Sequence, residues 1–235
     1  MTKRNILSGG LMVATTFLLL LVLLLSNLEA VAFDIRHYRE QFILLDRPAA
    51  TKMTEEELVW VTGEIWAYLQ GRREDLGLTA VIDGQRVPVF DRREQDHMLD
   101  VRDLFQKGYL LRNGGLILLL ILVITAVLLD KKRDWGESIA LIFTRAGVGG
   151  LIALGGLGLL LYFSFGTYFD KFHLLLFSND FWRLDPNRHN LIKMFPQDFF
   201  FHTTVKFVGR CMVQLAILVA ASGWYLYRKR GKGSR

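Results

Sequence analysis

Four apolar segments, each long enough to cross a membrane, constrain this chain more than any other feature. They cover residues 6–33, 108–129, 139–169 and 207–227. The hydrocarbon core of a bilayer requires about 20 predominantly apolar residues per α-helix. The first segment resembles a signal peptide in following Lys3 and Arg4, but it is long for one and lacks a clear cleavage site. We therefore expect an α-helical membrane protein with four transmembrane helices.

Basic residues at the ends of these segments predict the topology. Lys3 and Arg4 precede the first segment, residues 131–133 separate the second from the third, and residues 228–230 follow the fourth. An even number of spans places all three clusters on one side, which the positive-inside rule makes cytoplasmic. Both termini are then cytoplasmic, and the connections 34–107 and 170–206 are extracytoplasmic. The net charge of +6 forms no basic stripe, so no nucleic-acid partner is expected.

The first connection, 34–107, has the pattern of a small α+β cap. Thr54 followed by Glu57 is a capping-box pattern that opens an amphipathic helix, which Gly71 ends. Two β-prone runs within residues 78–90 flank Asp83 and Gly84, a strong hairpin signal. Such a cap is small for a stable core of its own, so we expect it to pack on the second connection.

That second connection is unusually aromatic and contains the first catalytic candidate, His173. Another candidate, His97, lies as many residues before Trp135 as His173 lies after it. If the second and third spans form an antiparallel hairpin that turns near Trp135, both histidines reach the same height and can meet.

A histidine pair suits general acid/base chemistry near neutral pH. Asp100 lies three residues after His97, on the same helical face, where a carboxylate could orient the imidazole. Asn179, Asp180 and Trp182 are expected to form a polar cluster on an aromatic wall, although Asn179 and Asp180 could instead cap local turns. The sequence lacks the motifs of serine hydrolases, zinc proteases and P-loop enzymes.

Two other interpretations of the histidines stay open. Each could satisfy a buried hydrogen bond, or the pair could bind zinc with a third ligand from Asp100, Asp180 or Asp185. The only cysteine, Cys211, excludes a disulfide and a cysteine-based zinc site. We predict neither a metal nor another cofactor.

Four motifs together resemble the lipoprotein intramolecular transacylases, which are multi-pass bacterial membrane enzymes. They are H-M-x-D-V at 97–101, F-x-x-F-H at 169–173, N-D-x-W-x-L-D-P at 179–186 and L-I-x-M-F-P at 191–196. The chain departs from the family pattern at His189, where an acidic residue is common.

The resemblance implies a cofactor-free acyltransferase of the bacterial cell membrane with an extracytoplasmic active site. Its substrate would be a diacylglyceryl lipoprotein, whose sn-2 acyl chain moves to the amine of the N-terminal cysteine. The two catalytic histidines of the family match His97 and His173, with the roles of acid and base unassigned. The alternative is a non-enzymatic membrane protein whose cap binds a partner or membrane lipid.

Overall fold

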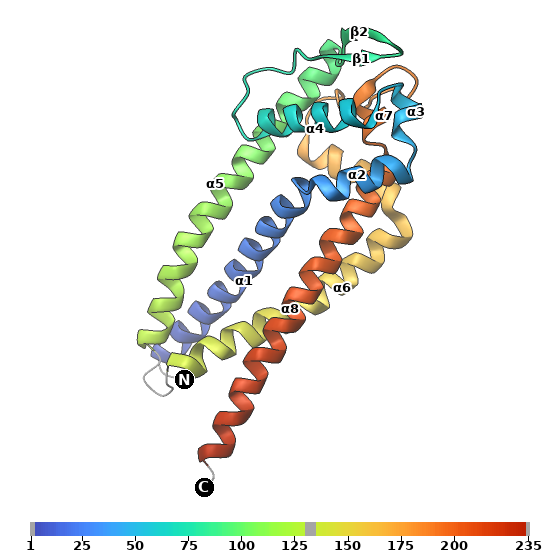
Figure 1. Cartoon of the computed structure of the whole chain (residues 1–235). Helices are drawn as coiled ribbons and strands as arrows, with labels where there is room; N and C mark the ends of the chain where they lie inside the picture. Colours follow the sequence, from blue (N-terminus) through green and yellow to red (C-terminus); the bar gives the residue numbers. More distant parts are fainter. Residues whose placement is uncertain (1–2, 130–134, 234–235) are drawn as a thin grey trace. The chain divides into compact units, whose positions relative to one another are not determined.

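The computed structural model describes residues 3–129 and 135–233, and four long helices dominate it. These are α1 (Lys3–Ala32), α5 (Arg92–Leu129), α6 (Trp135–Leu176) and α8 (Gln197–Gly233) (Figure 1). Each is long and apolar enough to contain a membrane span, which confirms the predicted class of multi-pass helical membrane protein. The basic residues Lys131, Lys132, Arg133 and Arg235 lie outside the described residues.

The chain divides into two compact units. Unit 1 comprises Met1–Glu29, Leu110–Leu159 and Phe207–Arg235, and unit 2 comprises Ala30–Tyr109 and Leu160–Lys206. The three segments in unit 1 belong to helices that are long and apolar enough to cross a bilayer.

Small residues let the helices of unit 1 pack closely. A Cβ atom added at Gly147 would lie 2.3 Å from the Val219 side chain, and one at Gly150 would lie 2.6 Å from Leu20. In the same unit, the Asn27 amide donates to the Gln214 side chain at 2.8 Å and so links α1 to α8. Close packing at small residues and hydrogen bonds between side-chain amides are typical contacts between helices in lipid.

Unit 2 holds the shorter elements. They are α2 (Ile35–Leu44), α3 (Arg47–Thr51), α4 (Glu55–Leu69), β1 (Thr79–Ile82), β2 (Gln85–Pro88) and α7 (Asn190–Met194). The unit also includes the beginnings of α5 and α8 and the end of α6.

Local sequence signals set the boundaries of two of these elements. The Thr54 hydroxyl accepts the Glu57 amide hydrogen at 3.2 Å, and Gly71 follows α4 with a φ of 75°. The predicted hairpin forms with Ile82 opposite Gln85, while φ is 53° at Asp83 and 76° at Gly84. Two central residues with positive φ make a type I′ turn, which matches the twist of the strands.

The core of unit 2 joins the two connections. Leu191 and Met194 of α7 belong to the same buried cluster as Leu58 and Val61 of α4. Asn190 also donates its side-chain amide to the Val89 carbonyl at 2.7 Å. The expected packing of the cap on the second connection is therefore confirmed.

Ser164 interrupts α6 within unit 2. Its φ of −141° and ψ of 35° are not helical, so the helix bends there. The segment that follows, which includes His173, takes its direction from this bend.

Candidate active site

His97 of α5 and His173 of α6 lie side by side in unit 2. Their ring centroids are 6.2 Å apart, and the ring planes are inclined by 40°. Both residues are buried, with exposed fractions of 8% and 9%. The predicted proximity of the two histidines is confirmed.

The surroundings of His173 fix both its orientation and its tautomer. Nδ1 lies 2.7 Å from the carbonyl oxygen of Phe169. A carbonyl oxygen only accepts, so Nδ1 carries the hydrogen and Nε2 presents a lone pair. The indole of Trp182 stacks on the imidazole, with centroids 4.8 Å apart and planes inclined by 24°.

His97 has a different environment. Its buried Nδ1 has no hydrogen-bond partner, and its ring contacts Phe177 edge to face at 5.4 Å between centroids. The expected hydrogen bond to Asp100 is not formed. Asp100 Oδ2 instead accepts the side-chain amide of Asn179 at 2.8 Å, because the loop after α6 passes this face of α5.

Both histidines lie outside the expected spans 108–129 and 139–169. The segment before the second span is too charged for hydrocarbon, with Arg92, Arg93, Glu94, Asp96, Asp100, Arg102, Asp103 and Lys107. Burial, followed by the effect of charge on His173, lowers the pKa of His97 to about 4, and Asp100 opposes the shift. Burial also lowers the pKa of His173, against its bond to Phe169. Both imidazoles are consequently neutral at pH 7.

The loop residues 179–182 make distinct contacts near the histidine pair. Besides binding Asp100, Asn179 accepts the Phe181 amide hydrogen at 3.1 Å, as in a local turn. Asp180 is exposed and pairs with Arg93 at 3.3 Å. Trp182 is the predicted supporting residue whose ring stacks on a histidine of the pair. Asn179 and Asp180 thus attach the loop to α5.

Two residues outside the predicted site support this arrangement. Buried Glu94 accepts the Asp91 amide hydrogen at 2.8 Å and the Leu191 amide hydrogen at 2.7 Å. Buried His189 accepts the Asp185 amide hydrogen at Nδ1, and its Nε2 lies 3.3 Å from an Asp91 carboxylate oxygen. Acidic residues three apart at the start of a helix could have identified Glu94 as half of a cap. These bonds give His189 a structural position that joins the second connection to α5.

The described residues also bear on the zinc alternative. Among residues 3–129 and 135–233, no group of three or more His, Cys, Asp or Glu side chains is arranged to hold a metal ion. The histidine pair therefore lacks a third protein ligand in the described part of the chain. The absence of a cofactor from the reaction stays a prediction.

Comparison with known families settles the class of protein. The model of the lipoprotein intramolecular transacylase (Lit) family matches residues 13–200. The chain belongs to this family. It is thus an acyltransferase of the membrane, and the non-enzymatic alternative is set aside.

Solved structures of Lit from Bacillus cereus share its fold. One has a TM-score of 0.80 at 20% sequence identity, with 96% of this chain and 99% of the other covered. A histidine-to-arginine variant gives a TM-score of 0.76 at 20% identity, with 97% and 96% covered. No curated protein matches the sequence. The Lit fold accordingly extends over nearly the whole chain.

Proposed function

We propose that this Lit family member moves the sn-2 acyl chain of a diacylglyceryl lipoprotein to the amine of its N-terminal cysteine. The product is a lyso-form, N-acylated lipoprotein. The observation that carries the proposal is the pair of buried, adjacent imidazoles of His97 and His173. A reaction that needs one proton removed and another delivered can use one imidazole as the base and the other as the acid.

His173 is the general base in this mechanism. Its Nδ1–H is held by the Phe169 carbonyl, so the Nε2 lone pair is available to take a proton from the substrate ammonium. His173 releases this proton to solvent. The free amine then attacks the sn-2 ester carbonyl, a C–N bond forms, and His173 takes the second proton from the attacking nitrogen. Trp182 keeps the imidazole plane fixed during this step.

His97 is the general acid. An unpaired buried N–H group is rarer in proteins than an unpaired acceptor, so the unpartnered Nδ1 favours the tautomer with the hydrogen on Nε2. That Nε2–H protonates the glyceryl oxygen as its bond to the acyl carbon breaks. Transfer of a proton from His173 back to His97, directly or through substrate, restores both residues.

The amine and the ester belong to one substrate molecule, so positioning contributes to the rate. Well-oriented intramolecular reactions gain as much as about 7–11 kcal/mol over their bimolecular counterparts. Phe177 contacts both histidines, at 5.4 Å from His97 and 5.8 Å from His173 between centroids. Phe177 and Trp182 form an apolar wall against which the acyl chain and glyceryl group fold.

The expected topology completes the proposal. The segments 6–33, 108–129, 139–169 and 207–227 cross a bacterial cell membrane, and the regions 34–107 and 170–206 are extracytoplasmic with the active site. Both termini are cytoplasmic, where basic side chains are favoured. The partners are the lipoprotein substrate and membrane lipids, with no nucleic acid.

Single His97→Gln and His173→Gln variants test the histidine mechanism. Each variant is given a lipoprotein with a deuterated sn-2 acyl chain, and its N-terminal peptide is analysed by mass spectrometry. We expect the wild type to place the label on the amine, and each variant to be slower by at least about a hundredfold.

His202→Gln is the matched control, because His202 binds Gln41 and is not in the pair. Size-exclusion chromatography checks that all variants are folded. Conversion at the wild-type rate by a folded variant would show that its histidine has no catalytic role. A product that is N-acylated without the label, with the label left on its glyceryl group, would disprove the sn-2 assignment alone.

A further inference from the structure

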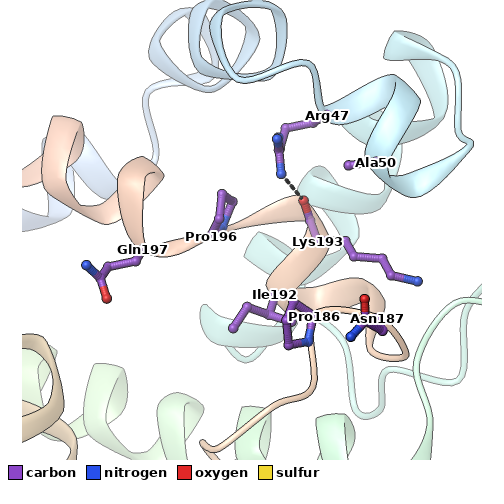
Figure 2. Close-up of a pocket in the computed structure, with 8 residues that line it drawn as sticks. All are labelled: Arg47, Ala50, Pro186, Asn187, Ile192, Lys193, Pro196 and Gln197. Atoms are coloured by element: carbon purple, nitrogen blue, oxygen red, sulfur yellow. Dashed lines mark hydrogen bonds between the residues drawn. The ribbon is translucent and has the colours of Figure 1, made fainter. Parts of the chain in front are cut away.

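Unit 2 contains a second candidate site, built from elements other than those that carry the histidine pair. It is a cavity of about 610 Å³ next to α3 and α7 (Figure 2). Its lining residues are Arg47, Ala50, Pro186, Asn187, Ile192, Lys193, Pro196 and Gln197. Two of them are basic and none is acidic.

Arg47 contributes a fixed positive charge. Its Nη1 donates to the Lys193 carbonyl at 3.0 Å, and Nε and Nη2 donate to the Leu45 carbonyl. These contacts use three of the five guanidinium N–H groups. Figure 2 shows the guanidinium directed at the Lys193 carbonyl. The side chain thus ties α3 to α7 and retains two free donors, with no carboxylate partner in the described part of the chain.

Lys193 contributes a second charge without a partner. It is half-buried, and its ammonium makes no hydrogen bond or ion pair with any of residues 3–129 or 135–233. Its backbone is held at both ends, by the Arg47 bond and by its N–H bond to the His189 carbonyl at 3.3 Å. A partly desolvated, unpaired ammonium costs free energy unless an anion accompanies it.

Asn187 adds uncharged donors beside Lys193 (Figure 2). Its backbone N–H donates to Asp185 Oδ1 at 2.8 Å, and this turn leaves the side-chain amide without a partner among the described residues. The bond also directs the Asp185 carboxylate into the turn. Neither Asp185 nor the other adjacent acids, Asp46 and Asp198, line the cavity.

We propose that this cavity binds a phosphate group. An acid-free cavity with two cations and several unused N–H donors complements an anion that has several acceptor oxygens. The group is either free phosphate or the phosphodiester of a lipid headgroup. The site is separate from the proposed transacylation chemistry and does not depend on it.

The test measures thermal unfolding of the full chain in an uncharged detergent, with sodium phosphate or with sodium chloride at equal ionic strength. At about a hundredfold excess over Kd, a ligand specific for the native state raises the midpoint by roughly 5–10 °C. We expect this saturable rise for the wild type and its loss in Lys193→Gln. Phosphate also stabilises proteins by exclusion from their surfaces, which affects every variant alike.

Arg86→Gln is the matched control, because Arg86 lies exposed on β2 and does not line this cavity. Asn187→Ala weakens the saturable rise without a change of charge, which keeps the test informative if Lys193→Gln unfolds. A second arm replaces phosphate by monomeric dihexanoylphosphatidylglycerol, and a Lys193-dependent rise at lower concentration identifies a lipid headgroup as the source. An equal rise in wild type, Lys193→Gln and Asn187→Ala with both compounds would overturn the proposal.

Discussion

The Phe169 carbonyl oxygen, one helical turn before His173, lies 2.7 Å from its Nδ1 and fixes which nitrogen of that imidazole is basic. The bond exists because a side-chain N–H at position i can reach the carbonyl at i−4 on the same helix face. It leaves Nε2 as the proton acceptor of a ring whose centroid lies 6.2 Å from that of His97.

The rate of transacylation should fall in acid. Burial lowers the pKa of His173 from its ordinary value of 6.5, so the neutral base persists below that pH. We expect kcat/KM to be constant near neutral pH and to decline with an apparent pKa below 6.5. A pH–rate profile in detergent micelles measures it, and a midpoint above 6.5 would contradict the proposed environment of the base.

The stability of the protein should also fall in acid, partly through His97. Its pKa is about 4 in the folded protein against an ordinary value of 6.5, so the unfolded chain binds more protons between these values. The stability that the neutral ring contributes is present above pH 6.5 and is lost as the pH falls toward 4. His97→Gln should reduce the slope of the unfolding midpoint against pH in this window, and an unchanged slope would refute the argument.

Replacing Trp182 should impair catalysis without unfolding the protein. Aromatic stacking contributes about 0.5–1.5 kcal/mol beyond burial, so Trp182→Ala should lower kcat by roughly twofold to tenfold. Trp182→Phe keeps an aromatic face and should lose less. Trp60→Ala is the control, since that indole is 44% exposed and is not among the rings that contact the pair. Equal effects of the Trp182 and Trp60 replacements would argue against a role for the stack.

Glu94→Gln should destabilise unit 2. Each carboxylate oxygen of Glu94 accepts one backbone N–H, and the amide of glutamine would present hydrogens to one of these donors. A buried polar group left without its partner costs about 1–3 kcal/mol. Chemical unfolding measures the loss. Glu55→Gln, which breaks only the exposed pair with Arg39, should cost less than about 1 kcal/mol, and similar losses in both variants would contradict this account.

A methyl group should be tolerated at Gly149 but not at Gly147. An added Cβ at Gly147 meets Val219 at 2.3 Å and the Leu215 carbonyl oxygen at 3.3 Å, whereas at Gly149 nothing lies within 4 Å. Overpacking typically costs about 1–3 kcal/mol, so Gly147→Ala should lower the thermal midpoint in detergent. Gly149→Ala should leave it equal or higher, and the reverse order would show that α6 does not pack on α8 in this way.

Local patterns in the sequence predicted the elements of unit 2 because their causes are local. The Thr54 cap, the end of α4 at Gly71 and the turn at Asp83 and Gly84 depend on residues within a few positions of one another. The approach of His97 to His173 was predictable for another reason. In a helical hairpin, two residues that are the same number of positions from the turn lie at the same level along the helix axes.

The partners of the polar side chains could not be predicted in this way. Asp100 shares a face with His97, but on a helix the same face also meets the loop that contains Asn179. Whether the Asp100 carboxylate binds His97 or Asn179 depends on the path of that loop. Glu94 likewise binds Leu191, and His189 binds Asp91, about 100 positions away in each case. Spacing along the chain carries no signal for bonds between such distant residues.

The sequence by itself determined the four apolar helices, the hairpin and the pairing of two histidines, because hydrophobicity, backbone preference and helical period act over short distances. Only the tertiary structure decided that Phe169 sets the tautomer of His173, that Asp100 binds Asn179 and that Lys193 is left without an anion. These outcomes depend on which donors and acceptors meet when segments distant in sequence pack together, and a buried polar group binds whatever partner that packing supplies.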